Sequence, residues 1–213
     1  MYRLTADLTF PPVELASPEG ILAFGGDLSP ERLLLAYRNG IFPWFNIDEP
    51  IIWWSPDPRM VLFFNELKIS KSMRNVLNRD EFKITFNKDF SAVIRNCQQV
   101  VRKGQEGTWI SEQMITAYEK LFELGHAKSV EVWQNGELVG GLYGIDLGHV
   151  FCGESMFSKV SNASKVAFIS LVNHLDANKY SLIDCQVYNE HLASLGCREI
   201  NREDFMKIIK MAD

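Results

Sequence analysis

The chain has 213 residues, of which 46% are hydrophobic and 23% are charged. This composition is typical of a folded globular protein and excludes a disordered or fibrous chain. The formal net charge of −5 excludes long-range attraction of the whole molecule to nucleic acid, so any site for a polyanion must be built from a local group of basic residues.

The sequence lacks the patterns of membrane helices, signal peptides, disulfides and metal sites, and our expectations about compartment and metal content follow from this. No apolar run approaches the ~20 residues of a membrane helix, and the first residues, MYRLTADLTFPPVE, do not have the basic and apolar regions of a signal peptide. We therefore expect a cytoplasmic protein without membrane association. The four cysteines form no C-x-x-C pair and the four histidines no H-E-x-x-H spacing, so we expect neither disulfides nor a metal site.

Residues 1–62 are rich in glycine, proline and aromatic residues, and we interpret them as an N-terminal domain. They contain one clear helix, SPERLLLAYRNG, which Ser29 caps and Asn39-Gly40 ends. Short strands are expected over 51–54 and 60–64. Between the helix and the second strand, GIFPWFNIDEPIIWWSPDPR contains three of the five tryptophans. Such a loop is either covered by another part of the fold or is a surface on which a flat ligand stacks.

Residues 63–79 are predicted to connect the two parts of the chain through a basic helix, KSMRNVLNR, over 71–79. At 100° per residue, Lys71, Arg74 and Arg79 fall within an arc of about 140°, opposite the apolar residues of the helix. Two interpretations remain open. The arc is either an ordinary solvated helix face or a surface that follows phosphates.

Residues 80–213 alternate between strand and helix patterns. Strands and helices in this order favour the α+β class, with a mixed sheet and helices on its faces. An Asn135-Gly136 hairpin turn is the clearest local signal. The expected strands are 82–86, 128–134, 137–148, 149–157 and 181–189, and the expected helices are 89–102, 111–125, 161–179 and 201–212.

Two carboxylates lie inside otherwise apolar strands, Glu154 in FCGESMF and Asp184 in DCQVYN. A buried carboxylate costs several kcal/mol unless it has a partner or a task. Each is therefore either half of a structural ion pair with a core arginine or an acid of a functional site. Gln186 is two residues from Asp184, so both side chains point to one face of a regular strand. The carboxylate can then orient the amide, whose oxygen becomes a weak proton acceptor, sufficient for an amine but not for an alcohol.

Several longer motifs together resemble one family, the leucyl/phenylalanyl-tRNA–protein transferases. They are GILAFGGDLSPERLLLAYRNGIFPWF, IIWWSPDPR, EGTWI, GHAKSVEVW, ELVGGLYG, FCGESMFS, NASK and LIDCQVYNEHLASLGCREI, and the similarity runs from about residue 10 to 204. The resemblance implies transfer of Leu or Phe, and weakly Met, from Leu-tRNA or Phe-tRNA to the α-amino group of a protein that begins with Arg or Lys. The product is a signal for protein degradation. It also implies a C-terminal domain with a GCN5-related N-acetyltransferase fold, no cofactor and no metal, and we expect a monomer.

The same resemblance implies a role for individual residues. Gln186 corresponds to the proposed proton acceptor and Asp184 to the group that polarises it, while Glu154 holds the Arg or Lys of the acceptor. Trp44 and Trp109 stack on or flank the adenine of the aminoacyl-adenosine. The aminoacyl side chain enters a pocket formed by Leu142, Phe151, Phe168, Leu171 and Ile183, and the tRNA phosphates are bound by Lys71, Arg74 and Arg79, with help from Arg102 and Lys103.

Two other functions are weighed against this one. An acetyl-CoA-dependent N-acetyltransferase would need a glycine-containing turn whose amides hold pyrophosphate at a helix start, but the corresponding stretch, FSKVSNASK, has no glycine. A non-catalytic module that binds tRNA or peptide would not need the pair of Asp184 and Gln186, so its function would survive Asp184→Ala.

Overall fold

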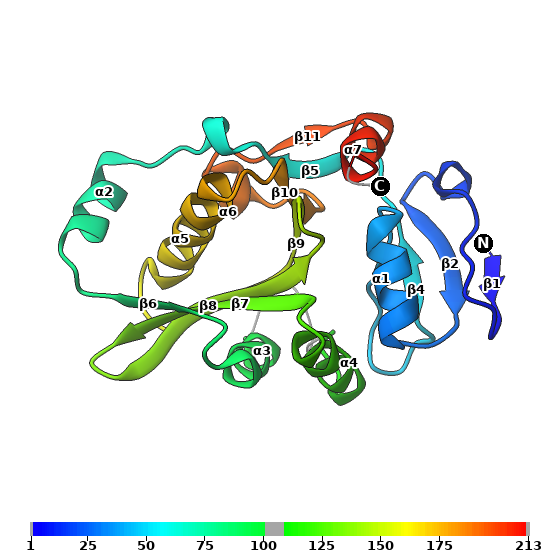
Figure 1. Cartoon of the computed structure of the whole chain (residues 1–213), viewed down its shortest axis with the longest axis horizontal. Coiled ribbons are helices and arrows are strands. Elements are labelled where there is room, and N and C mark those ends of the chain that lie inside the picture. The colour runs from blue at the N-terminus through cyan, green and yellow to red at the C-terminus, as the bar shows by residue number, and fades with distance from the viewer. Residues whose placement is uncertain (1, 101–108, 212–213) are drawn as a thin grey trace.

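The computed structural model describes residues 2–100 and 109–211, which form a smaller and a larger β-sheet with helices around them (Figure 1). The smaller sheet has the strand order β1-β2-β4-β3. Its strands are β1 (Tyr2–Leu4), β2 (Ile21–Gly25), β3 (Phe42–Pro43) and β4 (Ile52–Trp54). Helix α1 (Pro30–Arg38) lies on the side of this sheet that faces the larger one. Its predicted cap is confirmed, because the Ser29 side chain accepts a hydrogen bond from the backbone N–H of Arg32.

The larger sheet is mixed, as the sequence predicts. Its order is β11-β5-β10-β9-β8-β7-β6, and β9 and β10 are parallel while the other neighbours are antiparallel. The strands are β5 (Arg59–Leu62), β6 (Lys83–Phe86), β7 (Ala127–Gln134), β8 (Glu137–Asp146), β9 (Val150–Ser158), β10 (Leu182–Gln186) and β11 (Arg198–Ile200).

Several strand assignments differ from the sequence-based ones, and β1, β2 and β3 have no predicted counterpart. β5 pairs with β10 and β11 in the larger sheet, although the sequence groups it with residues 1–62; the division into domains itself stays a prediction. β10 ends at Gln186, three residues before the expected end, because the backbone of Gln186 takes a positive φ of 65°. The edge strand β11 was not expected at all.

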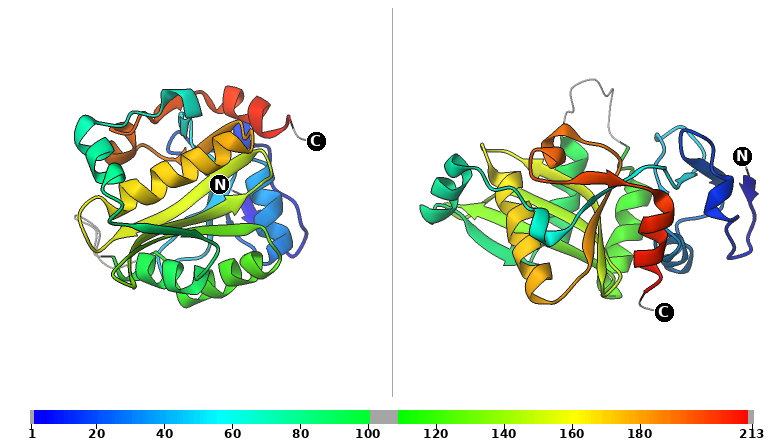
Figure 2. Two further views of the ribbon diagram at one scale, coloured as in Figure 1. Left: turned by 60° about the vertical axis from the view of Figure 1, so that its left-hand side comes forward. Right: turned by 90° about the horizontal axis from the view of Figure 1, so that it is seen from above.

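Helices cover both faces of the larger sheet (Figure 2). Helices α3 (Phe90–Gln99) and α4 (Glu112–Glu123) lie on one face, and α5 (Ala163–Ala177) lies on the other. The remaining helices are α2 (Lys71–Asn78), α6 (Glu190–Ala193) and α7 (Arg202–Ile209), and two 3-10 turns span Val13–Leu15 and Phe64–Glu66. Within the described residues, no helix is long and apolar enough to cross a bilayer.

Side-chain alternation along the strands divides the core into two clusters. Leu142, Phe151 and Ile183 belong to the cluster beneath α5, whereas their neighbours Tyr143 and Cys152 belong to the cluster on the opposite face. Successive side chains of a strand point to opposite faces, so residues from β8, β9 and β10 meet on the α5 side of the sheet.

Two glycines have clear structural reasons. Gly136 follows Asn135 in the β7–β8 turn, where φ is +51° and then +85°, the pair of positive values that a two-residue type I′ hairpin requires. At Gly140, a Cβ atom would lie 2.5 Å from the Cβ of Ala163. The absence of a side chain there lets the first turn of α5 pack directly on β8.

Candidate active site

One cavity of about 320 Å³ gathers the predicted site residues. It is lined by the segment that includes Phe42, Pro43 and Trp44, by Trp109 before α4, and by side chains from the larger sheet, α5 and the segment after β10. Every residue predicted for the adenosine, the aminoacyl side chain and the acceptor lines it: Trp44, Trp109, Leu142, Phe151, Glu154, Phe168, Leu171, Ile183 and Gln186.

The apolar end of the cavity consists of the five residues predicted for the aminoacyl side chain. Leu142, Phe151 and Ile183 project from β8, β9 and β10, and Phe168 and Leu171 project from α5. All five are buried in the same core cluster. The fold therefore brings together residues that are up to 41 positions apart, from Leu142 to Ile183. Their function as a side-chain pocket stays a prediction.

The tryptophan-rich loop is partly buried and partly open to the cavity. Trp53 is fully buried and its indole Nε1 donates to the carbonyl of Gly25 at 2.9 Å. Trp54 donates from Nε1 to the carbonyl of Trp44 at 2.6 Å, and the two rings lie 5.5 Å apart. Trp44 stays 38% exposed, whereas Trp109, which also lines the cavity, is 9% exposed. The loop thus buries Trp53, while Trp54 supports Trp44, which lines the cavity and stays partly exposed.

Glu154 is held by donors from two different elements. Its Oε2 accepts a hydrogen bond from the Tyr118 hydroxyl at 3.0 Å, and its Oε1 accepts one from Nε2 of Gln186 at 2.7 Å. The Tyr118 hydroxyl also contacts the Tyr37 hydroxyl at 2.5 Å. Burial raises the pKa of Glu154 to about 7, although the hydroxyls of Tyr37 and Tyr118 and the amide of Gln186 act in the opposite direction.

Asp184 forms a buried ion pair with an arginine that the sequence analysis did not assign. Nε and Nη2 of Arg59 donate to the two carboxylate oxygens at 2.8 and 2.7 Å, and both side chains are at most 1% exposed. The guanidinium lies between the rings of Phe42 and Phe205 and also donates to the carbonyl of Gly40. Burial lowers the pKa of Arg59, but the adjacent Asp184 charge outweighs it and the net shift is upward.

The expected contact between Asp184 and the amide of Gln186 is replaced by another. The Asp184 carboxylate accepts a hydrogen bond from the backbone N–H of Gln186 at 2.9 Å, while the side-chain amide of Gln186 donates to Glu154. The same-face rule does not apply here, because the register with β5 shifts between the two residues and Gln186 has a positive φ. Glu154 therefore orients the amide, and Asp184 fixes the backbone that carries it.

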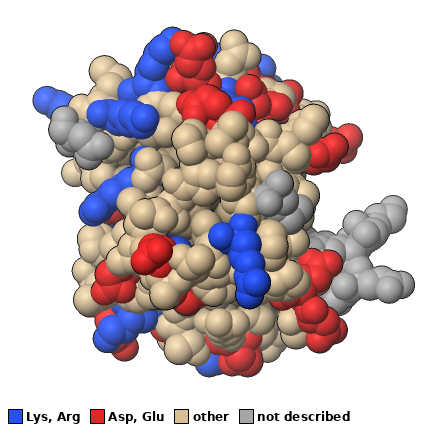
Figure 3. Space-filling model, turned by 90° about the vertical axis from the view of Figure 1, so that its right-hand side faces the viewer, with Lys and Arg blue, Asp and Glu red and all other residues tan. Residues whose placement is uncertain are grey.

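The basic residues predicted for tRNA lie outside the cavity. Lys71, Arg74 and Arg79 are exposed on or next to α2, and Arg79 pairs weakly with Glu81 at 3.7 Å. In Figure 1, α2 lies at the end of the molecule remote from the smaller sheet. At the opposite end, Figure 3 shows acidic and basic side chains interspersed. Arg102 and Lys103 fall outside the described residues.

The charges around the cavity favour a cationic ligand. Glu154 is the one acid among the described residues that line it, and no lysine or arginine of that set does so. His191 also lines the cavity, and burial, helped by Lys165, lowers its pKa, which favours the neutral ring. Across residues 2–100 and 109–211, no group of three or more His, Cys, Asp or Glu side chains is placed to hold a metal ion.

Sequence reasoning missed the polar groups behind the cavity, namely Tyr37, Arg59 and Tyr118. None of the three has a role in the sequence-based prediction of the site. A usable signal did exist, because a buried tyrosine hydroxyl normally needs a hydrogen-bond partner. The sequence predicts that Asp184 could pair with a core arginine, but it does not indicate which arginine this is.

Comparisons with known proteins give a consistent family. A family model described as leucyl/phenylalanyl-tRNA protein transferase matches residues 61–210, and the model for the N-terminal domain of the same transferase matches residues 26–57. The leucyl/phenylalanyl-tRNA–protein transferase of Flavobacterium johnsoniae is 70% identical to this chain, and the alignment covers 99% of each of the two chains. That of Flavobacterium psychrophilum is 64% identical, over 99% of this chain and 100% of the relative. That of Syntrophobacter fumaroxidans is 56% identical, over 98% of this chain and 89% of the relative.

Solved structures show only a distant likeness. L-PGS from Bacillus licheniformis is 15% identical with a TM-score of 0.43, over 81% of this chain and 57% of that one. A ribosomal-protein-alanine N-acetyltransferase from Brucella melitensis is 14% identical with a TM-score of 0.39, over 51% of this chain and 80% of that one.

Proposed function

This chain belongs to the leucyl/phenylalanyl-tRNA–protein transferase family, and on that premise we propose how its cavity carries out the transfer. The protein is an aminoacyltransferase. Its donor, in our proposal, is Leu-tRNA or Phe-tRNA, with Met-tRNA as a weak substitute. Its acceptor is the α-amino group of a protein that begins with Arg or Lys, and the product is a degradation signal.

One observation carries this proposal: a single cavity combines an apolar pocket, an aromatic rim and one carboxylate. The Leu or Phe side chain of the donor enters the pocket beneath α5, where its burial is favourable. The terminal adenine stacks on Trp44 and is flanked by Trp109, and such stacking contributes roughly 1–3 kcal/mol per base. The ester that joins them then lies near Gln186, between the two subsites.

The acceptor is selected by Glu154. Both carboxylate oxygens already accept one hydrogen bond each, from Tyr118 and Gln186, but a carboxylate oxygen has a second lone pair for a further donor. A lysine or arginine side chain supplies that donor and a positive charge. Because no other charged side chain among the described residues lines the cavity, a peptide that begins with Asp or Gly gains no such contact.

The chemical step requires placement more than a strong base. The neutral α-amine attacks the ester carbonyl, a C–N bond forms, the C–O bond to the ribose breaks, and the amine proton passes to the departing 3′-oxygen. Since an α-amino group has a pKa of about 7.7–8.0, roughly a tenth of it is neutral near pH 7. The carbonyl oxygen of the Gln186 amide accepts a hydrogen bond from the attacking nitrogen, and Glu154 holds the amide in the required orientation.

Asp184 then acts as a positioning residue. Its pairing with Arg59 is buried on all sides, and its carboxylate also holds the Gln186 backbone in the positive-φ conformation. We assign the exposed side chains of Lys71, Arg74 and Arg79, on or next to α2, to the phosphates of the tRNA acceptor stem, as the family resemblance implies. We further propose that the protein acts as a monomer in the cytoplasm.

A peptide-bond assay tests the proposal. The protein is incubated with Leu-tRNA carrying labelled Leu and with a peptide that begins with Arg, without ATP, acetyl-CoA or added metal. We expect a Leu-Arg peptide, identified by mass spectrometry. The product should disappear when the first residue of the peptide is Asp or Gly, and Glu154→Gln should raise the KM for the Arg peptide at least tenfold.

Two results would contradict the assignment. Label incorporation that depends on acetyl-CoA would identify an N-acetyltransferase instead. Tight binding of Leu-tRNA without any peptide product, unchanged in Asp184→Ala, would identify a non-catalytic binding module.

A further inference from the structure

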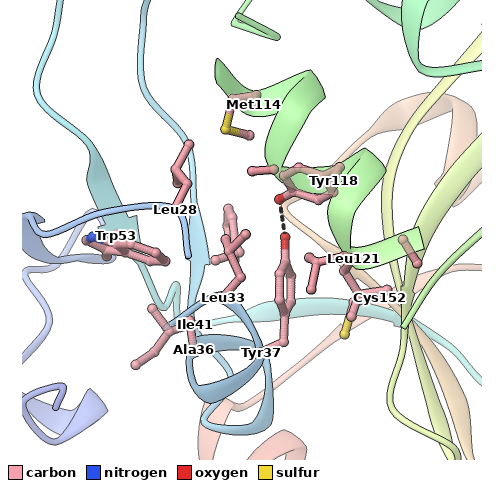
Figure 4. Packing of buried hydrophobic residues seen from close by; sticks show 14 of the residues in the cluster. Leu28, Leu33, Ala36, Tyr37, Ile41, Trp53, Met114, Tyr118, Leu121 and Cys152 are labelled. Atoms are coloured by element: carbon pink, nitrogen blue, oxygen red, sulfur yellow. Dashed lines mark hydrogen bonds between the residues drawn. The ribbon is translucent and has the colours of Figure 1, made fainter. Parts of the chain in front are cut away.

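A hydrogen-bonded chain links helix α1 to the candidate acceptor site. It runs from the Tyr37 hydroxyl on α1 to the Tyr118 hydroxyl on α4 and ends at the Glu154 carboxylate on β9. Figure 4 shows the two tyrosines pointing toward each other from their helices, with apolar side chains around them. Both residues are at most 1% exposed. A purely apolar contact there would be made equally well by two phenylalanines, without the cost of burying two hydroxyls.

The direction of the hydrogen bonds follows from the number of protons. Tyr118 has one hydroxyl proton, and it points to Glu154. The hydrogen bond between the two tyrosines must therefore be donated by Tyr37. Burial first, and the charge of Glu154 second, raise the pKa of both tyrosines well above its usual value, so both hydroxyls keep their protons. Tyr37 donates to Tyr118 and Tyr118 donates to the Glu154 carboxylate. Hydrogen bonds donated toward a carboxylate favour the ionised form of that carboxylate.

Other titratable groups also face Glu154. From β10 the Asp184 charge opposes its ionisation, but Arg59 from β5 is paired to Asp184 through two hydrogen bonds. Burial raises the pKa of the Cys152 thiol on β9, which therefore stays neutral. Tyr143 from β8 packs edge-on against Tyr118. The remaining balance is between burial, which disfavours the charge, and the Tyr37 and Tyr118 hydroxyls and the Gln186 amide, which favour it.

We propose that the hydroxyls of Tyr37 and Tyr118 position the Glu154 carboxylate and keep it ionised near neutral pH, so that helix α1 takes part in acceptor selection. This inference rests on the proposed function in one respect only, the use of Glu154 to hold the Arg or Lys of the acceptor. Tyr37 and Tyr118 are positioning residues, because they act on the substrate through Glu154.

Tyr118→Phe is the direct test. The cation of the acceptor binds the ionised carboxylate, so binding rises as the pH passes upward through the pKa of Glu154. Loss of one donor to the charged form raises that pKa, and we expect the midpoint of the kcat/KM profile for an Arg peptide to move up by about one pH unit. Near pH 7 the KM for the peptide should rise several-fold. Near pH 9, where the carboxylate is ionised in both proteins, kcat should be within about twofold of the unaltered enzyme.

Tyr180→Phe is the matched control. Its hydroxyl also donates to a carboxylate, that of Asp146 at 2.8 Å, but neither residue lines the active-site cavity. The midpoint of the pH profile of kcat/KM should be the same in this variant as in the unaltered enzyme. Tyr37→Phe removes the outer hydroxyl alone and should move the profile in the same direction as Tyr118→Phe. It decides the question if Tyr118→Phe does not fold, as judged by circular dichroism and thermal unfolding.

A second readout does not depend on the transfer reaction. In protein labelled with ¹³C at the glutamate carboxyls, the Glu154 signal is identified by its loss in Glu154→Gln, and its titration reports the pKa directly. An unmoved Glu154 titration in both folded tyrosine variants overturns the inference, and so does an equal shift in Tyr180→Phe. A shifted titration in a protein that transfers no Leu to the Arg peptide would overturn the proposed function and leave the hydroxyl effect standing.

Discussion

Glu154 makes the stability of the fold depend on pH in a way that can be measured. Its pKa is about 7 in the folded protein, against about 4.5 for a solvated glutamate, chiefly because of burial. The folded state thus binds the proton more tightly than the unfolded state does. The resulting stabilisation is fully present below pH 4.5 and is lost as the pH rises through about 7.

Glu154→Gln should remove this pH dependence. The free energy of unfolding of the unaltered protein, relative to Glu154→Gln, is expected to fall between pH 4.5 and 7 and to level off above that range. Because the side chain is partly open to the cavity, we expect a change on the order of 2 kcal/mol. Urea unfolding at pH 4.5, 6 and 8 measures it, and parallel curves for the two proteins would contradict the expectation.

The Asp184–Arg59 pair should show the asymmetry of a buried ion pair. Asp184→Leu leaves the guanidinium of Arg59 buried without its partner and should cost about 3–5 kcal/mol of unfolding free energy. Arg59→Met combined with Asp184→Leu removes both charges and should cost much less than the sum of the two single changes. Chemical denaturation of the four proteins of this cycle measures the coupling, and additive costs would mean that the two residues do not act as a pair.

At the scale of elements, local chemistry predicts helix starts well and strand details poorly. Ser70 and Ser111 cap α2 and α4 by accepting hydrogen bonds from backbone N–H groups, and a short sequence window contains all the information for such a cap. The positive φ of Gln186 is different, because the backbone there is fixed by Asp184 and by pairing with β5, more than 120 residues away in the chain. No local pattern marks this bulge, so the expected same-face geometry was wrong, and the role of the two residues stays a prediction.

Helix α2 carries the element-scale prediction. Met73 is 4% exposed and anchors it, so its basic residues can be changed without disturbing the core. Lys71→Ala combined with Arg74→Ala should weaken binding of Leu-tRNA and lower the slope of log affinity against log salt by roughly 0.7–0.9 for each lost phosphate contact. Filter binding between 50 and 200 mM salt measures both quantities.

Lys207→Ala on α7 is the control for this pair, because that lysine is exposed and already paired with Glu203 and Asp204. It should leave both the affinity and the salt slope unchanged. If the α2 double variant keeps the original slope, the basic arc is an ordinary solvated helix face and the tRNA runs elsewhere.

At the scale of the whole molecule, the two sheets share one hydrophobic core cluster. It contains Leu22 and Trp53 from the smaller sheet, Tyr37 from α1, and Tyr118 and Leu121 from α4. Apolar contacts therefore continue without a break from the N-terminal strands to the helices that cover the larger sheet. A continuous core of this kind favours unfolding in one cooperative step.

Trp53→Ala tests this cooperativity from the N-terminal side. The indole is fully buried, lies edge-on to the ring of Phe10 and donates to the carbonyl of Gly25, so its removal should cost about 3–5 kcal/mol. In a single cooperative unit the far-ultraviolet circular dichroism, which reports on all helices and strands, and the fluorescence of the remaining tryptophans should lose signal at one shared, lowered midpoint. Two separated transitions, with only the first moved by the substitution, would instead mean that residues 1–62 and 80–213 fold independently. The candidate active-site cavity would then depend on docking of these parts rather than on a common core.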